Sequence, residues 1–317
     1  LFIGAASTAF AQVEITQADF PAIGETITFG DDADVSNLTL DFGPTGGGQA
    51  FDFTMFETDG LTDVGFYDPS TVQGGSDFPS ADLAVDQVGG IFAFAEVGVG
   101  AVDIIGLGGD FAEQLGSPIP IVVSMPAVDP WTLFEFPASI NSPILTDTAL
   151  FEGKFLSTGL VPAPYNAFWD PDSVHVKRTI YYSAEIDADG VLTDVLDGTH
   201  NVIRMNVVET SIDTIWGWTA SDGWARPDAF VEGLIGVPSN ETVYKKRYIS
   251  KELGYYVVDV TTEANGTPVS ATFVSGPSEC CTGIEEVIAA GGNVLYPNPT
   301  SESVRIRTGE EGSDAIG

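Results

Sequence analysis

The first 153 residues of this 317-residue chain contain no lysine and no arginine, although they contain 23 aspartates and glutamates. The whole chain has 11 basic and 46 acidic residues, and its net charge at pH 7 is −35. Such a surface repels nucleic acids and anionic membranes, so neither is expected as a partner. Because few ion pairs can form in the first half, its self-repulsion has to be relieved by salt or by bound cations.

Cysteine is almost absent, since the chain has only the adjacent pair Cys280 and Cys281. This excludes a disulfide framework, and two neighbouring thiolates without a nearby histidine do not complete a zinc site. The pair could form a vicinal disulfide, bond to another chain or have no role. Apolar runs of membrane-spanning length are also lacking, because Glu96 and Asp103 interrupt the best one, 89–109.

Catalytic motifs are missing as well. The sequence has no phosphate-binding loop, nucleophile elbow or zinc-protease helix, and only two histidines, His175 and His200. A glycosidase needs two carboxylates at a set separation, and nothing in the sequence singles out one pair among the 46 acidic residues. The sequence therefore leaves enzymatic activity undecided and leans against it.

What the chain does have is a β pattern along nearly its whole length. Short runs rich in β-branched and aromatic residues alternate with glycine, proline, aspartate and asparagine, which predicts an all-β, mainly antiparallel fold, either a β-sandwich or a curved half-barrel. The expected strands are 26–29, 38–40, 50–54, 91–95, 102–106, 174–186, 191–193, 201–210, 214–219, 255–261 and 269–274. Ala188-Asp189-Gly190 is expected to be a tight hairpin turn, because Asp-Gly supplies positive φ angles. A helix is expected only at 228–235.

Two stretches, 117–130 and 161–171, are rich in proline. The second suggests a boundary between an acidic region, 12–165, and an antiparallel region, 166–275, although the two could form one domain. A linker at 276–293 would then lead to a last segment, 294–317.

Two groups of residues are weak candidates for binding. Trp216, Trp218 and Trp224 are spaced by small and polar residues and could stack on sugar rings; the alternative is that Trp216 and Trp218 share a strand face that belongs to the core. The dense acidic loop with Asp31, Asp32 and Asp34 is the better candidate for calcium, and no other cofactor is expected.

Both ends of the chain carry export features. Residues 1–11 form an apolar run with Ala9 and Ala11 at the positions that signal peptidase requires, so they predict the remnant of a signal peptide. Near the other end, Gly283-Ile284-Glu285-Glu286 precedes a small-residue spacer and then Tyr296-Pro297-Asn298-Pro299-Thr300, followed by the alternating stretch Ser303 to Ile306. This order resembles the start of the type A C-terminal sorting domain of type IX secretion cargo.

The resemblance implies a truncated β-sandwich sorting domain at 294–317 and the outer-membrane secretion machinery as a partner. It also implies a secreted or outer cell-surface location in a Gram-negative bacterium. The 166–275 region, with its Gly198-Thr199 turn and aromatic-rich loop, loosely resembles the body of uncharacterised cargo proteins, which carries no activity with it.

The leading hypothesis is therefore a secreted or surface-attached β-sheet protein without catalytic activity that acts in adhesion, matrix structure or ligand binding, with a glycan or cell-surface polysaccharide as a possible partner. One alternative is a secreted carboxylate-based hydrolase, with or without calcium, that acts on polysaccharide. Another is a half-barrel carrier of an apolar ligand.

Overall fold

The computed structural model describes residues 12–111, 120–157, 169–196, 198–235 and 238–276, together with two short strands at 294–296 and 305–307. Two compact units, Leu1–Glu279 and Cys280–Gly317, divide the chain. The first contains fourteen strands: β1 Thr26–Asp32, β2 Gly46–Asp52, β3 Gly60–Tyr67, β4 Leu83–Val88, β5 Ile91–Val97, β6 Ala101–Asp110, β7 Val122–Glu135, β8 Leu145–Leu156, β9 Ser173–Thr193, β10 Thr199–Thr219, β11 Gly223–Ala225, β12 Ser239–Ser250, β13 Tyr256–Thr262 and β14 Pro268–Val274. The helical elements described are η1 Gln17–Asp19, η2 Pro69–Thr71, η3 Gly75–Asp77 and α1 Ala229–Ile235.

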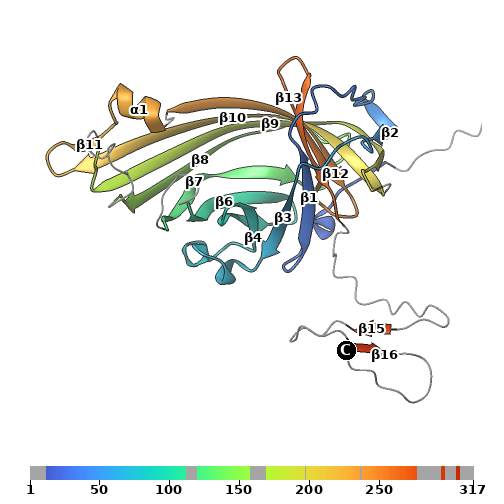
Figure 1. Ribbon diagram of the computed structural model, residues 1–317, viewed down its shortest axis with the longest axis horizontal. Helices are drawn as coiled ribbons and strands as arrows, with labels where there is room; N and C mark the ends of the chain where they lie inside the picture. The colour runs from blue at the N-terminus through green and yellow to red at the C-terminus, as the bar shows by residue number, and fades with distance from the viewer. Residues whose placement is uncertain are drawn as a thin grey trace, which may run out of the picture. The chain divides into compact units, whose positions relative to one another are not determined.

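Twelve of these strands form a closed antiparallel sheet (Figure 1). Each strand from β3 to β9 pairs with the next, β9 pairs with β10, and the ring returns through β12, β13, β14 and β1 to β3. Two short strands attach outside the ring: β2 lies parallel to the end of β9, and β11 pairs with the end of β10. The expected all-β, antiparallel class is confirmed, and the sheet closes where the sequence suggested half a barrel. Strands from both expected regions, 12–165 and 166–275, belong to this one sheet.

Apolar side chains fill the inside of the closed sheet. Strand β6 shows the cause: its residues alternate between buried and half-buried positions, as expected when one face of a strand points into a core. The largest buried cluster takes side chains from β5 to β10 and from the N-terminal segment, where Ile15 forms an isolated bridge with Ala138. Phe151 and Tyr182, both almost fully buried, belong to this cluster.

A second apolar layer lies on the outside of the ring, where the segment between β1 and β3 crosses the sheet. Phe51 and Phe53 of this segment both contact the buried ring of Tyr248, with ring centroids 4.9 Å apart in each pair. The buried Arg204 fastens the same segment: it forms a bidentate ion pair with Asp187 and donates hydrogen bonds to the carbonyl groups of residues 42–44. The crossing segment is therefore an integral part of the fold.

The expected hairpin turn at Ala188-Asp189-Gly190 is wrong, because these residues lie within the continuous strand β9. The turn falls instead just before β10, where the Asp194 carboxylate accepts hydrogen bonds from the backbone N–H groups of Leu196 and Gly198. The β9–β10 register shifts between Arg204 and Met205, which stand opposite Ala188 and Ile186. Asp187 is the extra residue of β9 at this shift, so the strand has a β-bulge there.

Other sequence expectations have mixed outcomes. The 91–106 hairpin, the helix at 228–235 and the two strands before residue 275 are confirmed. The proline-rich stretch 117–130 contains the start of a strand that was not predicted, because β7 runs from Val122 through Pro126 and Pro130. The expected strand at 38–40 is wrong, since no strand covers these residues. The proline-rich stretch 161–171 falls mostly outside the described residues.

The second unit contains the antiparallel strands β15 Val294–Tyr296 and β16 Arg305–Arg307. Tyr296 of the expected sorting motif ends β15, whereas residues 297–300 lie outside the described residues. So do residues 1–11 with Ala9 and Ala11, and the cysteine pair. No helix in the described part of the chain is long and apolar enough to cross a membrane.

Candidate functional site

The three tryptophans proposed for ligand stacking lie together at one end of the sheet. Trp216 and Trp218 belong to β10, and Trp224 belongs to β11, where it stands opposite Trp218 in the strand register. Trp216 and Trp218 are half-buried, but Trp224 has 45% of its surface exposed. Trp224 is therefore the most accessible of the three rings.

His175 of β9 joins two of these indoles. It stands opposite Trp216 in the β9–β10 register, and the two ring centroids are 5.3 Å apart. The Trp224 ring approaches the same imidazole edge-on, at 5.8 Å. We call His175, Trp216 and Trp224 the aromatic cluster. The sequence pattern indicated the two tryptophans but assigned no binding role to His175.

Basic side chains from neighbouring strands surround the aromatic cluster. The Lys154 ammonium lies 5.7 Å from the centroid of the Trp224 ring, within the range of a cation–π contact. Glu152 lies 3.6 Å from the Lys177 ammonium and 3.3 Å from Nε2 of His175, although the latter contact lacks hydrogen-bond geometry. Two lysines against one glutamate leave a local positive excess on a chain of net charge −35.

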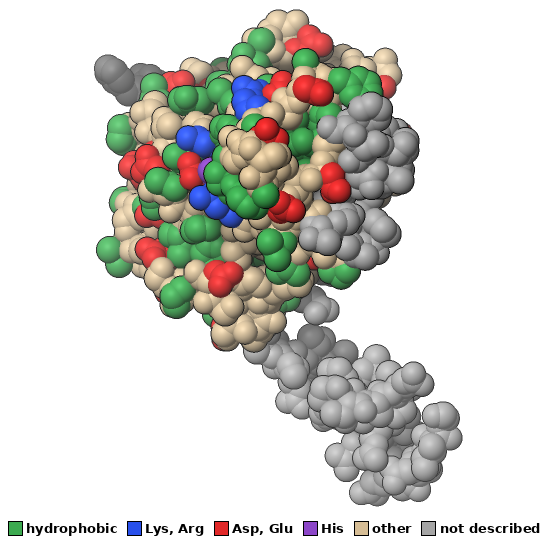
Figure 2. Space-filling model, turned by 90° about the vertical axis from the view of Figure 1, so that its left-hand side faces the viewer, with side chains coloured by type: hydrophobic (Ala, Val, Ile, Leu, Met, Phe, Trp, Pro, Cys, Tyr) green, Lys and Arg blue, Asp and Glu red, His purple; other side chains and the backbone are tan. Residues whose placement is uncertain are grey.

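Figure 2 shows this end of the molecule, where lysine and arginine side chains gather next to a histidine while acidic side chains are spread over the rest of the face. The strand register explains the grouping: Lys154 stands opposite His175, and Glu152 stands opposite Lys177, so alternate residues of β8, β9 and β10 share one face of the sheet. The face opposite carries Phe151 and Ile180 of the core. The aromatic cluster and its lysines therefore lie on the outside of the ring.

The three aspartates proposed for calcium point to different places. The Asp31 carboxylate accepts a hydrogen bond from the Thr272 hydroxyl, whereas the buried Asp32 accepts one from the backbone N–H of Glu57. Asp34 lies beyond β1 and binds the hydroxyl and backbone N–H of Ser36. Among the described residues, no three histidine, cysteine, aspartate or glutamate side chains are grouped to hold a metal ion.

A serine, a histidine and an aspartate do meet elsewhere. His200 lies 2.9 Å from Asp194 and 3.4 Å from the hydroxyl of Ser250. However, Ser250 is fully buried, its hydroxyl donates to Glu252 at 2.8 Å, and it accepts from the backbone N–H of Leu253. A nucleophile needs access to substrate and a free path for its proton to the histidine. This arrangement instead stabilises the turn between β12 and β13.

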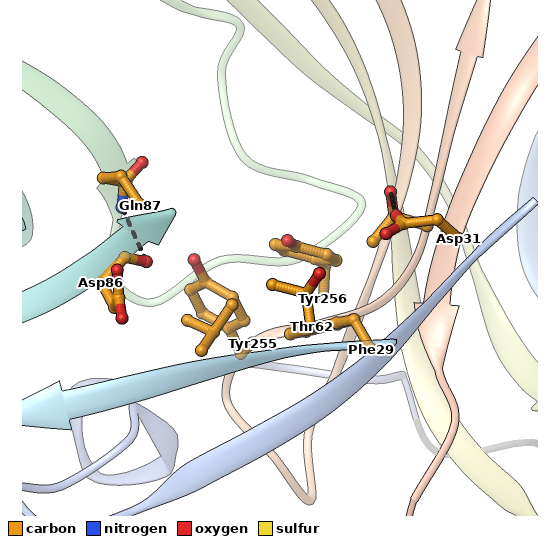
Figure 3. A pocket seen from close by; sticks show the side chains of 9 residues that line it. Phe29, Asp31, Thr62, Asp86, Gln87, Tyr255 and Tyr256 are labelled. Carbon is orange, nitrogen blue, oxygen red and sulfur yellow. Dashed lines mark hydrogen bonds between the residues drawn. The ribbon is translucent and has the colours of Figure 1, made fainter. Parts of the chain in front are cut away.

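A pocket of about 180 Å³, which no sequence pattern indicated, lies at β1, β3, β4, β13 and β14 (Figure 3). Its lining combines aromatic rings, hydroxyl groups and carboxylates: Phe29, Asp31, Thr62, Val64, Asp86, Gln87, Tyr255, Tyr256 and Thr272. The pair Tyr255-Tyr256 is the only local signal, because the other residues come from strands far apart in the chain.

The fold and the outer cluster together define an all-β protein with a closed antiparallel sheet and an exposed aromatic and basic surface. No protein-family model matches the chain, and no curated protein matches it.

Two solved structures are similar to it. One is a protein from Parabacteroides distasonis that is provisionally described as a lipoprotein, with 10% identity, a TM-score of 0.34, and coverage of 82% of this chain and 98% of that one. The other is a provisionally described exported protein with a YmcC-like fold from Bacteroides fragilis, with 9% identity, a TM-score of 0.27, and coverage of 83% and 98%. At these values neither structure assigns a family or a function to the chain.

Proposed function

We propose that this chain is an exported, non-catalytic binding protein of the cell surface that holds an anionic polysaccharide against the outer face of β8, β9 and β10. The observation that carries the proposal is the exposed Trp224, held against His175 and beside Lys154 on an otherwise acidic protein. An exposed indole can pack on the apolar face of a sugar ring, and the lysines can pair with its carboxylate or sulfate groups.

Export by type IX secretion is part of this proposal. It is supported by the apolar run that ends at Ala11 and by the sequence from Tyr296 to Thr300. Display outside the cell would bring the aromatic cluster into contact with surface polysaccharides, which are often acidic.

The alternative functions have less support. A carrier of an apolar ligand needs an enclosed apolar cavity, whereas buried side chains such as Phe151 and Ile203 occupy the inside of the sheet. A carboxylate-based hydrolase needs two carboxylates beside the bound sugar, and Glu152, the carboxylate described beside the aromatic cluster, is already paired with Lys177.

The proposal is tested by measuring binding of alginate, a polymer of uronic acids, by affinity electrophoresis, with the neutral polymer dextran as the comparison. We expect alginate alone to retard the protein, and we expect Trp224→Ala to weaken binding about tenfold, or about 1.4 kcal/mol. That magnitude is what loss of one stacking surface and one exposed cation–π contact would give.

Tyr181→Ala is the matched control, because Tyr181 is 49% exposed and stands on the same outer face of β9, away from the aromatic cluster. It should leave alginate binding unchanged. Equal binding by the wild type and by Trp224→Ala, or retardation by dextran as strong as by alginate, would contradict the proposal.

A further inference from the structure

The pocket lies where two neighbouring strands of the ring separate. Within the described strands, the β3–β4 register covers only Phe66 opposite Val85 and Tyr67 opposite Ala84. On its other side, β3 pairs with β1 along the whole stretch from Gly60 to Gly65. The rest of β3 and the end of β4 therefore diverge, and the pocket is lined by Thr62 and Val64 from one strand and by Asp86 and Gln87 from the other.

A stack of aromatic rings supports the pocket. The Phe29 and Tyr256 rings are stacked with centroids 4.7 Å apart, and Tyr255 lies 4.6 Å from Tyr256. Phe66 packs edge-on against Tyr255 at 5.2 Å. Because neighbouring rings hold one another in place, the two tyrosine hydroxyls have fixed positions (Figure 3).

Those hydroxyls are held in their neutral form. Burial raises the pKa of Tyr255 to about 12 and raises the pKa of Tyr256 well above its usual range. At neutral pH each hydroxyl can therefore donate one hydrogen bond and accept others.

The charge of the lining is negative. Asp31 and Asp86 contribute carboxylates from β1 and β4, and none of the nine lining residues is a lysine, arginine or histidine. Arg247 lies over the Tyr256 ring at 5.2 Å, but it is paired with Asp259, whose carboxylate is 2.7 Å from its guanidinium. Lys245 lies 3.7 Å from the same carboxylate, so these three groups together carry a net charge of +1. The two lining carboxylates carry −2, so the charge around the pocket remains negative.

We propose that this pocket binds a small organic cation that carries a primary ammonium group, held by Asp31 and Asp86. An ammonium group has three donors, which match the carboxylate and hydroxyl oxygens of the lining. The volume of about 180 Å³ is below the 300–1,000 Å³ of pockets for drug-sized ligands, so the ligand has few carbon atoms. An anion would meet two carboxylates, and none of the nine lining residues is basic.

The test is isothermal titration of the full chain with n-butylammonium, with n-butanol and butyrate as neutral and anionic probes of similar shape. We expect saturable binding of butylammonium with a dissociation constant of about 1 mM, and no saturable binding of the other two probes. If butanol bound as tightly as butylammonium, or if butylammonium did not bind at millimolar concentrations, the assignment would be overturned.

Two variants locate the ligand. Asp31→Asn keeps an acceptor for the Thr272 hydroxyl but removes the charge, and we expect it to weaken butylammonium binding about tenfold. Asp86→Asn tests the opposite wall of the pocket and should have a similar effect. The melting temperature of each variant establishes that it is folded.

Asp63→Asn is the matched control, because it removes the same charge from the exposed side of β3, where Asp63 accepts a hydrogen bond from Thr28. An equal loss of binding in Asp63→Asn and Asp31→Asn would mean that only the overall charge of the protein matters, and would refute the site. The pocket is independent of the aromatic cluster, so Trp224→Ala should bind butylammonium as the wild type does.

Discussion

Inside the closed sheet, whether a buried ionisable side chain is charged or neutral depends on whether a side chain of opposite charge lies beside it. Burial alone would lower the pKa of Arg247, but the carboxylate of Asp259 raises it and prevails, so the guanidinium stays charged. Tyr182, which is 3% exposed, has only a long hydrogen bond of 3.4 Å to the carbonyl of Leu133. Burial raises its pKa to about 12, so its phenol stays neutral.

This shift predicts how stability depends on pH. In the unfolded chain a tyrosine ionises near pH 10, whereas Tyr182 in the folded protein keeps its proton to about pH 12. Stability is therefore lost as the pH rises through this interval, by about 1.4 kcal/mol at pH 11 from this group. Tyr182→Phe should lose less stability than the wild type between pH 8 and pH 11 in urea unfolding.

The exposed neighbour Tyr181 provides the comparison, because its ring is in contact with water in the folded state. Tyr181→Phe should follow the pH dependence of the wild type. If Tyr182→Phe did so too, the phenol of Tyr182 would not be the group that resists ionisation.

Among the elements, β9 shows why part of this fold could not be predicted from the sequence. Asp189-Gly190 has the composition of a hairpin turn, yet the strand continues because distant backbone approaches it. The Asp189 carboxylate accepts hydrogen bonds from the backbone N–H groups of Gly48 and Val13, and Gly190 stands opposite Gln49 of β2. The local turn propensity of Asp189-Gly190 is overridden by contacts with residues more than 100 positions away in the chain, and a single sequence does not reveal such contacts.

The close contact at Gly190 leads to a specific expectation. A Cβ atom at Gly190 would come within 2.0 Å of the Gln49 carbonyl oxygen, so Gly190→Ala has to push β2 away from β9. We expect this variant to lose about 1–3 kcal/mol of unfolding free energy, as overpacked sites do, when measured by urea denaturation.

Gly60→Ala, at the start of β3, is the matched substitution because nothing lies within 4 Å of its added Cβ. It should change the unfolding free energy by less than about 0.5 kcal/mol. Similar losses in both variants would show that the approach of β2 does not constrain Gly190.

Elements with strong local patterns were predictable. The 91–106 hairpin and the strands near 255–274 combine alternating apolar residues with clear turns, and both are confirmed. Strand β7 was not predicted, because Pro126 and Pro130 interrupt its strand pattern. In the structure, the β6–β7 register shifts next to Pro126, and β7 pairs with β8 at only two register positions. Prolines are tolerated in strands at such irregular places.

The candidate sites likewise contain some residues that local sequence could indicate and others that it could not. Trp216, Trp218 and Trp224 could be nominated because tryptophan is rare and locally grouped. The approach of His175 and Lys154 depends on the β8–β9–β10 register, and the pocket depends on a gap between β3 and β4. Register and closure are properties of the folded sheet, so they could not be predicted from residue patterns.

For the molecule as a whole, the main unfavourable feature is its net charge of −35, which favours an expanded chain. We expect the melting temperature to rise as sodium chloride is increased from low concentration to 1 M, where the Debye length falls to about 3 Å. A gain of about 1 kcal/mol would raise it by about 2–4 °C for a protein of this size.

The same measurement with calcium chloride and magnesium chloride at equal ionic strength separates screening from binding. Equal melting temperatures in the two salts would indicate screening alone. A higher value in calcium would indicate specific binding of calcium at a site still to be located. A melting temperature that does not rise with salt would contradict the view that charge repulsion limits stability.

The ladder between β1 and β14 sets Phe29 opposite Val274, so the first and last strands of the ring are neighbours. A chain that emerges N-terminus first, from the ribosome or from an export channel, cannot complete this ring until residue 274 has emerged. Until then β1 has no β14 to pair with, and its exposed edge is open to chaperones or to other chains. Premature termination anywhere before β14 therefore leaves an open sheet that is prone to aggregation. Only a chain that extends through β14 can close the ring.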